Sequence, residues 1–401
     1  MLTRLPDHAR ETPQGREAES ILRSCVHCGF CNATCPTYGL LGDELDGPRG
    51  RIYLIKDMLE DGAAGEVTRR HLDRCLTCLA CETTCPSGVR YGRLLDIGRE
   101  QLEKNLPRPW KERVLRWGLR HVTTRPRLLR RLLPLAPLLP RRLAAPLRRH
   151  RPATAWPGPG GQRRLILLEG CAQSALRPDL NALTARLLHR LGYTVIRVRE
   201  VRCCGALSHH LAAGEEARRL MRANVDAWLP LLEDGAEAIV SNASACSLML
   251  RDYAHHLSDD PAYRDKAAQI SRRSRDITEV LAQADLSCLR PAHVRRPIAF
   301  HAPCTLQHGL RLGELTRDIL RRCGHELLPV ADEHLCCGAA GAYHILQPHL
   351  ARQLRNGKLA ALQAANPACI ATANIGCLLH LEEDAKVPVR HWLELLGSGE
   401  V

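Results

Sequence analysis

Eight cysteines near the start of the chain form two copies of the pattern CxxCxxCxxxCP. The first copy is Cys25, Cys28, Cys31 and Cys35, and the second is Cys75, Cys78, Cys81 and Cys85. This spacing is typical of bacterial-type [4Fe-4S] ligands, in which three closely spaced thiolates bind one cluster and the fourth cysteine binds the other. The residues therefore predict two [4Fe-4S] clusters and one-electron chemistry.

The same pattern predicts that the two ligand sets are crossed. One cluster is expected to take Cys25, Cys28, Cys31 and Cys85, and the other Cys75, Cys78, Cys81 and Cys35. Zinc is the alternative metal. Structural zinc sites, however, usually use four ligands from paired CxxC or Cys/His sets, and they do not require two four-cysteine runs that each end in proline.

Eight further cysteines recur later in the chain at an offset of about 133 residues. Cys171, Cys203, Cys204 and Cys246 align with Cys304, Cys336, Cys337 and Cys377. We treat them as candidate ligands of an additional iron-sulfur cluster, with thiol chemistry or a buried structural role as alternatives. The three cysteines without a patterned partner are expected to be small buried side chains; they are Cys288, Cys323 and Cys369.

Short apolar runs at residues 165–168 and 297–300 lead directly into the first cysteine of each repeat, as buried strands do. Leucines at helical spacing follow the first run, and further strands are predicted at 194–196 and 238–240. The cysteines thus lie at the carboxyl ends of predicted parallel strands, which meet at one crevice of an α/β sheet.

The predicted fold class is α + α/β. A helical ferredoxin-type domain with two clusters is expected at residues 1–105, a basic linker rich in Pro, Leu and Arg at 106–164, and two repeated α/β cysteine-rich (CCG) domains at 165–285 and 297–401.

The positive charge of the chain is concentrated in the linker. Residues 106–164 contain 16 Lys and Arg and one acid, Glu112, whereas the whole chain carries +14. Arginines alternate with leucines and with Trp110 and Trp117, a composition that favours peripheral contact with an anionic membrane surface. A solvated basic linker is the alternative. Nucleic acid is not an expected partner because no DNA-binding motif accompanies the charge.

Nineteen cysteines and a polar first segment indicate a chain with reduced thiols. Residues 1–20 lack the apolar core of a signal peptide, and no apolar run reaches the roughly 20 residues of a membrane span. We therefore expect a cytoplasmic protein, with peripheral attachment to the inner face of the cell membrane as an option.

Five short strings give the chain a resemblance to a known family. They are CCGA at 203–206, PCTLQH at 303–308, HLCCG at 334–338, TANIGC at 372–377 and VRHW at 389–392. Together with the order of motifs, they resemble the heterodisulfide-reductase-like iron-sulfur subunits of flavin-dependent 2-hydroxyacid dehydrogenases, a family that includes the glycolate oxidases.

That resemblance implies an electron-transfer subunit without catalytic residues of its own. An FAD-binding partner subunit would oxidise glycolate to glyoxylate, and this chain would relay the electrons to a quinone or another acceptor. The chain contains no GxGxxG turn, so a flavin site is not expected in it. The alternatives are a subunit of a lactate or glycerol-3-phosphate dehydrogenase, and a disulfide-reductase-type CCG protein.

One departure from the wider CCG family concerns the end of each repeat. The family usually has CxxC there, but the earlier cysteine is Ala243 in one repeat and Asn374 in the other. Five-cysteine clusters are therefore not expected. Four histidines near the second repeat are candidate ligands, hydrogen-bond donors or packing residues; they are His301, His308, His334 and His344.

Overall fold

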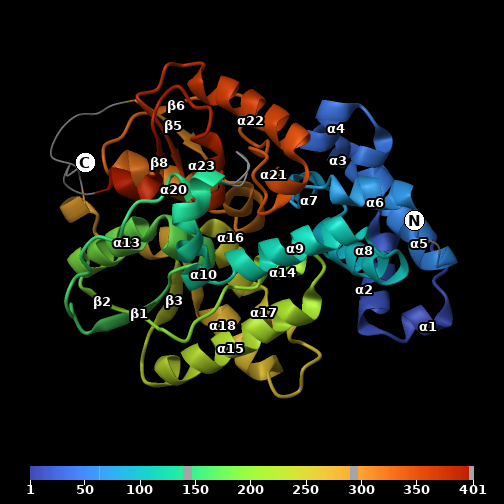
Figure 1. Ribbon diagram of the computed structural model, residues 1–401, viewed down its shortest axis with the longest axis horizontal. Coiled ribbons are helices and arrows are strands. Elements are labelled where there is room, and N and C mark those ends of the chain that lie inside the picture. Colours follow the sequence, from blue (N-terminus) through green and yellow to red (C-terminus); the bar gives the residue numbers. More distant parts are fainter. Residues whose placement is uncertain (63, 139–146, 290–296, 397–401) are drawn as a thin grey trace.

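The computed structural model describes residues 1–62, 64–138, 147–289 and 297–396, and it divides into a helical part and two α/β parts (Figure 1). The helical part is blue in the figure and holds the chain's N-terminus. The two α/β parts follow in green to yellow and in orange to red.

The N-terminal part is built from short helices around one apolar core. Leu22, Ile55 and Leu94 are fully buried in that core. The elements are α1 (Asp7–Arg10), α2 (Pro13–Ser24), α3 (Phe30–Ala33), α4 (Pro36–Leu41), the 3-10 turn η1 (Glu44–Asp46), α5 (Pro48–Asp61), α6 (Glu66–Asp73), α7 (Ala80–Thr84) and α8 (Tyr91–Asn105).

The basic segment contains α9 (Trp110–Thr123), α10 (Pro126–Leu132) and the 3-10 turn η2 (Leu133–Leu138). Its guanidinium groups are partly neutralised by the N-terminal part, since Arg108 and Arg116 bind Asp73 at 2.6 and 3.2 Å. Its leucines pack on the α/β parts through a shared apolar cluster. The segment is therefore a packed helical connection over much of its length.

The first repeat forms a parallel sheet with the strand order β2-β1-β3-β4. Its elements are β1 (Arg163–Leu168), α12 (Cys171–Leu176), α13 (Pro178–Arg190), β2 (Tyr193–Ile196), α14 (Ala206–His210), α15 (Gly214–Glu233), β3 (Ala238–Ser241), α16 (Ser244–Arg251), α17 (Tyr253–His256), α18 (Arg264–Arg273), β4 (Ser274–Asp276), α19 (Ile277–Ala282) and the turn η3 (Ser287–Leu289).

The second repeat has the matching order β6-β5-β7-β8, again all parallel. Its elements are β5 (Ile298–His301), the π-helical turn η4 (Thr305–Gly309), α20 (Gly313–Arg322), β6 (Leu327–Leu328), α21 (Tyr343–Leu346), α22 (Pro348–Gln363), β7 (Cys369–Thr372), α23 (Ile375–Leu381), β8 (Val389–His391) and the turn η5 (Trp392–Leu395). The predicted α + α/β class with two repeated cysteine-rich units is confirmed.

The two sheets share one apolar core. Leu165 of β1, Phe300 of β5 and Trp392 of η5 belong to a single buried cluster, which unites the two repeats as one body. Cys323 and Cys369 lie in this core as predicted, but Cys288 is exposed at the end of the first repeat, so the expectation that it is buried was wrong.

The edge strands β4 and β8 were not among the predicted strands. Each is three residues long and ends in a buried polar residue, Asp276 or His391, that caps the next element through a capping box. Apolar runs are the main signal for buried strands, and these edges lack one. Among the described residues, no helix has both the length and the hydropathy required to cross a membrane.

Candidate iron-sulfur and cysteine-rich sites

The first ferredoxin-type group gathers its thiols around one small cavity. Cys25 ends α2, Cys31 lies in α3 and Cys85 ends α7, yet all three line this cavity together with Cys28. Burial raises the pKa of the Cys31 thiol to about 11, and the neighbouring thiolates of Cys25, Cys85 and Cys28 add to that rise. The structure thus brings the distant Cys85 to the CxxCxxC loop of the other motif.

The second ferredoxin-type group lies deeper in the molecule. Cys75, Cys78, Cys81 and Cys35 are all buried. The pKa of Cys81 is raised well above its ordinary value, first by burial and then by the charges of Cys78, Cys75 and Cys35. Like-charged thiolates in such a group repel one another, and a cationic metal core relieves that repulsion. The donor set therefore fits a cluster.

Corresponding backbone turns shape the two CxxCxxC loops. His27 and Gly29 have positive φ angles of 57° and 83°, and Thr77 and Leu79, at the same places in the second motif, have 54° and 64°. Left-handed residues fold a short loop back on itself. Two amide groups then point at sulfur: the N–H of Thr77 lies 3.5 Å from Cys75 Sγ, and the N–H of Val89 lies 3.5 Å from Cys85 Sγ.

A buried arginine lies beside the second group. The Arg51 guanidinium is 4.0 Å from Cys35 Sγ, and Asp46 accepts from it at 3.3 Å. Both side chains are essentially inaccessible to solvent. A fixed positive charge next to ligand sulfur favours the more negative, reduced state of a bound cluster.

The four cysteines of the first repeat lie in contact with one another. Cys171 Sγ is 3.3 Å from Cys203 Sγ, and Cys204 Sγ is 3.6 Å from Cys246 Sγ. Their pKa values depend on one another: Cys171 and Cys204 raise that of Cys203, whereas bonds from Cys203 and Cys246 lower that of Cys204. The predicted set therefore converges.

An open cavity of about 1040 Å³ leads to Cys171 from the surface. It lies between α9 and α10 on one side and the first repeat on the other. Its two acids are already engaged, since Glu169 pairs with Arg197 at 3.0 Å and Glu216 with Arg120 at 3.2 Å. Eight arginines line it: Arg125, Arg127, Arg130, Arg131, Arg197, Arg199, Arg202 and Arg219.

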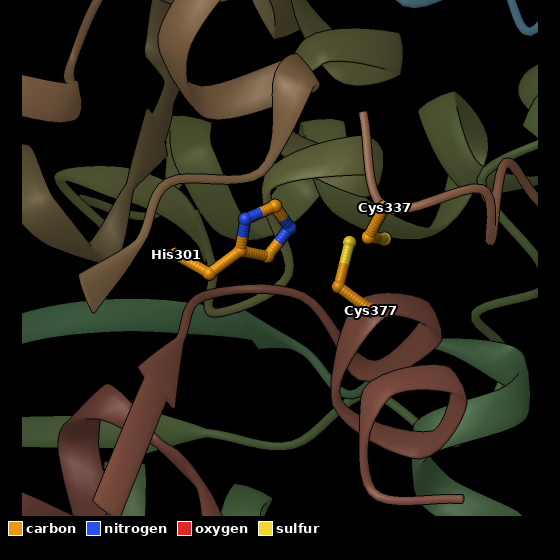
Figure 2. Close-up of side chains that lie close together, drawn as sticks. All are labelled: His301, Cys337 and Cys377. Atoms are coloured by element: carbon orange, nitrogen blue, oxygen red, sulfur yellow. The ribbon is translucent and has the colours of Figure 1, made fainter. Parts of the chain in front are cut away.

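The second repeat brings a histidine to its cysteines. His301, at the end of β5, points at the thiols of Cys337 and Cys377 (Figure 2), and one donor atom from each lies within 4.8 Å of the others. His301 is 2 % exposed, its Nε2 has no hydrogen-bond partner in the described part of the chain, and burial keeps its pKa well below the ordinary value. It is a neutral imidazole with a lone pair to offer.

Cys304 and Cys336 complete the second-repeat group, and the structure places it against the second ferredoxin-type group. Burial raises the pKa of Cys78 first, and the charge of Cys304 is the next cause. Cys78 and Cys336 share one apolar cluster with Tyr343 of α21. In Figure 1, α7 lies next to α21 and α22.

Among the described residues, none of the other three candidate histidines belongs to a group of three or more possible metal donors. His308 Nε2 donates to the carbonyl of His334 at 2.9 Å, and its Nδ1 lies 3.0 Å from Thr83 Oγ1. This side chain thereby joins α7 to the second repeat. His344 Nδ1 lies 3.2 Å from the carbonyl of Ala339.

Asn374, at the position where the wider CCG family has a cysteine, caps a helix. Its side chain accepts from the N–H of Gly376 at 2.9 Å and caps α23, which carries Cys377. Ala243 occupies the same place before α16 without a side-chain cap.

Comparison with known families and proteins agrees with this arrangement. The 4Fe-4S dicluster domain matches residues 21–89, and the Cysteine-rich domain matches residues 166–251 and 298–382. The N-terminal part is thus a domain for two [4Fe-4S] clusters.

Among relatives, the glycolate oxidase iron-sulfur subunit of Escherichia coli is 50% identical over 99% of this chain and 98% of its own. A probable glycolate oxidase iron-sulfur subunit of Bacillus subtilis is 30% identical over 92% of this chain and 90% of its own. Lactate utilization protein A of Bacillus subtilis is 23% identical, and it covers 59% of this chain and 99% of its own.

A solved structure of a hypothetical protein from Helicobacter pylori has a TM-score of 0.51 at 12% identity, covers 97% of this chain and 74% of its own, and supports the fold alone. The two-cluster domain, the paired cysteine-rich repeats and the full-length relatives show that this chain belongs to the family of glycolate oxidase iron-sulfur subunits.

Proposed function

We propose that this chain relays electrons in a complex that oxidises glycolate to glyoxylate. An FAD-binding partner subunit takes two electrons from glycolate, and this chain passes them singly toward a quinone or another acceptor. The proposal rests on family membership and on one structural observation: Cys78 of the second ferredoxin-type group packs against Cys336 of the second repeat.

The proposed ligands of the N-terminal clusters are the crossed sets. Cys25, Cys28, Cys31 and Cys85 hold one cluster, and Cys75, Cys78, Cys81 and Cys35 hold the other. When bound, the clusters supply one-electron transfer. The protein groups around them set the potential: the amides of Thr77 and Val89 donate to sulfur, and Arg51 adds a fixed positive charge.

The second repeat is the proposed place of a third metal centre. Cys304, Cys336, Cys337 and Cys377 provide four thiolates, and the unpartnered Nε2 of His301 provides a nitrogen donor. Cys78 and Cys336 are both buried in the apolar cluster where this group meets the N-terminal domain. The first repeat, whose Cys171 opens onto the arginine-lined cavity, is the weaker candidate for a further cluster.

Iron analysis tests these assignments. Anaerobically purified protein with two [4Fe-4S] clusters holds about 8 irons, and a third such cluster raises the count to about 12. Cys85→Ser should remove the cluster of Cys25, Cys28 and Cys31. Loss of the other cluster instead would contradict the crossed sets.

Glycolate-driven reduction tests the function. In the assembled complex, glycolate should bleach the visible absorption of the clusters within the turnover time. In a complex that carries Cys78→Ser, glycolate should still reduce the flavin of the partner subunit but should no longer bleach the clusters. Faster reduction by lactate than by glycolate would favour the alternative that the complex is a lactate dehydrogenase. The similarity to lactate utilization protein A is the reason to include lactate in the experiment.

Helix α9 is the proposed contact with the inner face of the cell membrane. Trp110, Val114 and Trp117 lie on one face of α9 and are exposed, Trp110 by 68 % and Trp117 by 56 %. Basic residues lie beside them, since Lys111 lies over the Trp110 ring at 5.8 Å and Arg113 is exposed. Helices that lie on anionic bilayers combine such residues in the same way. Replacing both tryptophans with serine should abolish sedimentation with anionic vesicles; equal sedimentation of the variant would refute the contact.

A further inference from the structure

A cluster of histidines and carboxylates lies where the ferredoxin-type domain meets the first repeat. Asp96 projects from α8, His209 and His210 from α14, and His256 from α17. Asp96 Oδ2 is 2.9 Å from His209 Nε2, and Asp96 Oδ1 is 3.8 Å from His210 Nδ1. The ring of His256 lies 4.4 Å from that of His209.

The geometry suits a tetrahedral metal ion. One donor atom from each of Asp96, His209 and His210 lies within 4.8 Å of the other two. The distances of 2.9 and 3.8 Å join His209 and His210 to different oxygens of Asp96. Metal–ligand bonds of about 2.0–2.2 Å allow a zinc ion to lie among the three side chains. Asp96 Oδ1 is buried and has no hydrogen-bond partner in the described part of the chain.

Histidines face the Asp96 carboxylate, and among the described residues no arginine or lysine forms an ion pair with it. Two arginines of the region pair with other acids: Arg93 with Asp252 at 2.8 Å, and Arg90 with Glu17 at 3.6 Å. Asp96 and His209 form a hydrogen-bonded ion pair in which, against the effect of burial, the charge of Asp96 raises the pKa of His209. A divalent cation would replace the proton of this pair.

Three protein ligands leave the fourth position of a tetrahedral zinc ion to a water molecule. Nitrogen and carboxylate donors together are typical of zinc.

A second acid-histidine group in the molecule shows the contrast. Asp46 also lies next to a histidine, His71, at 3.0 Å, but two arginines, Arg51 and Arg74, occupy its carboxylate at 3.3 and 2.7 Å. That group is neutralised by protein cations and has no need of a metal ion. The Asp96 cluster has no such arginines on its carboxylate among the described residues.

We propose that Asp96, His209 and His210 bind one zinc ion, which joins the ferredoxin-type domain to the first repeat. This inference is independent of the proposed electron route, because none of these residues belongs to a cysteine group.

Zinc analysis and X-ray absorption of the full-length protein test the proposal. After incubation with Zn²⁺ alone and gel filtration, we expect about one zinc per chain with nitrogen and oxygen neighbours at about 2.0–2.1 Å. Zinc bound by the cysteine groups would instead show sulfur at about 2.3 Å. A sulfur shell, or no retained zinc, would overturn the proposal without the use of any variant.

Matched variants sharpen the result. His210→Gln changes a side chain that is 45% exposed, so the fold is retained, and it should weaken zinc binding by about 10- to 100-fold while the iron content stays constant. His255→Gln on α17 is the control, because His255 faces Glu17 at 3.5 Å. Equal zinc affinity in His210→Gln and the control would refute the site.

Discussion

The two cysteine-rich repeats have the same sheet order and nearly the same cysteine spacing, but different surroundings. In the second repeat, His301 faces the thiols and Cys78 of the ferredoxin-type domain lies next to them. In the first repeat, the residue aligned with His301 is Leu168, and Cys171 opens onto a cavity lined by arginines.

The comparison shows that the fold gathers the thiols in both repeats, whereas the neighbouring residues determine what each group of thiols can do. Parallel strands that end at one edge gather four cysteines in either repeat. What each group can do then depends on its neighbours. A buried contact with another cysteine group suits electron transfer, whereas an open cavity lined by arginines suits the binding of an anionic ligand.

The largest expected effect distinguishes the two repeats directly. Cys336→Ser should reduce electron flow from glycolate to the acceptor by well over tenfold, because it removes a proposed ligand beside Cys78. The aligned change Cys203→Ser should have a much smaller effect. Steady-state rates of the assembled complex check this, and similar losses in both variants would remove the proposed functional difference.

An exchange of aligned residues is the next test. His301→Leu gives the second repeat the residue of the first and should weaken its metal binding by about 10- to 100-fold. Iron content and spectra report the result. Leu168→His is the matched control and should leave the second-repeat metal in place. If His301→Leu retains full metal content, His301 is not a ligand.

The capping residues of the two edge strands should respond to acid in opposite directions. Burial lowers the pKa of His391 to about 3, so its unfolded form binds protons more readily and stability falls as the pH drops from about 6.5 toward 3. Burial raises the pKa of Asp276, so its contribution becomes more favourable as the pH falls.

Urea unfolding of His391→Asn between pH 6.5 and 5.5, and of Asp276→Asn between about pH 5 and 4, measures this contrast. His391→Asn should remove up to about 1.4 kcal/mol per pH unit of acid sensitivity. Asp276→Asn should leave the protein slightly more acid-sensitive. An unchanged slope in His391→Asn would show that the histidine titrates normally.

The smallest expected effect concerns the contact between α7 and the second repeat. Thr83→Val removes the bond to His308 and should cost about 1 kcal/mol of unfolding free energy. Thr84→Val loses a bond to Thr34 inside the N-terminal domain and serves as the control. Only Thr83→Val should also slow reduction of the second-repeat centre in stopped-flow experiments.

Much of the fold could be predicted because its signals are local. Apolar runs before Cys171 and Cys304 marked the strands β1 and β5, and leucines at helical spacing marked α13. The edge strands β4 and β8 could not be found in this way, since five of their six residues are polar and their pairing with β3 and β7 depends on the assembled sheet. The exposure of Cys288 likewise depends on where the repeat ends.

The sequence by itself determined the chemistry of this protein: which thiols recur, at what spacing, and hence the two-cluster domain and the paired repeats. Only the tertiary structure decided which cysteine groups meet, that His301 lies beside the thiols of Cys337 and Cys377, and that Asp96 meets His209 across a domain boundary. The reason is physical. Ligand spacing within a loop is a property of consecutive residues, whereas contacts between distant segments depend on how whole elements pack.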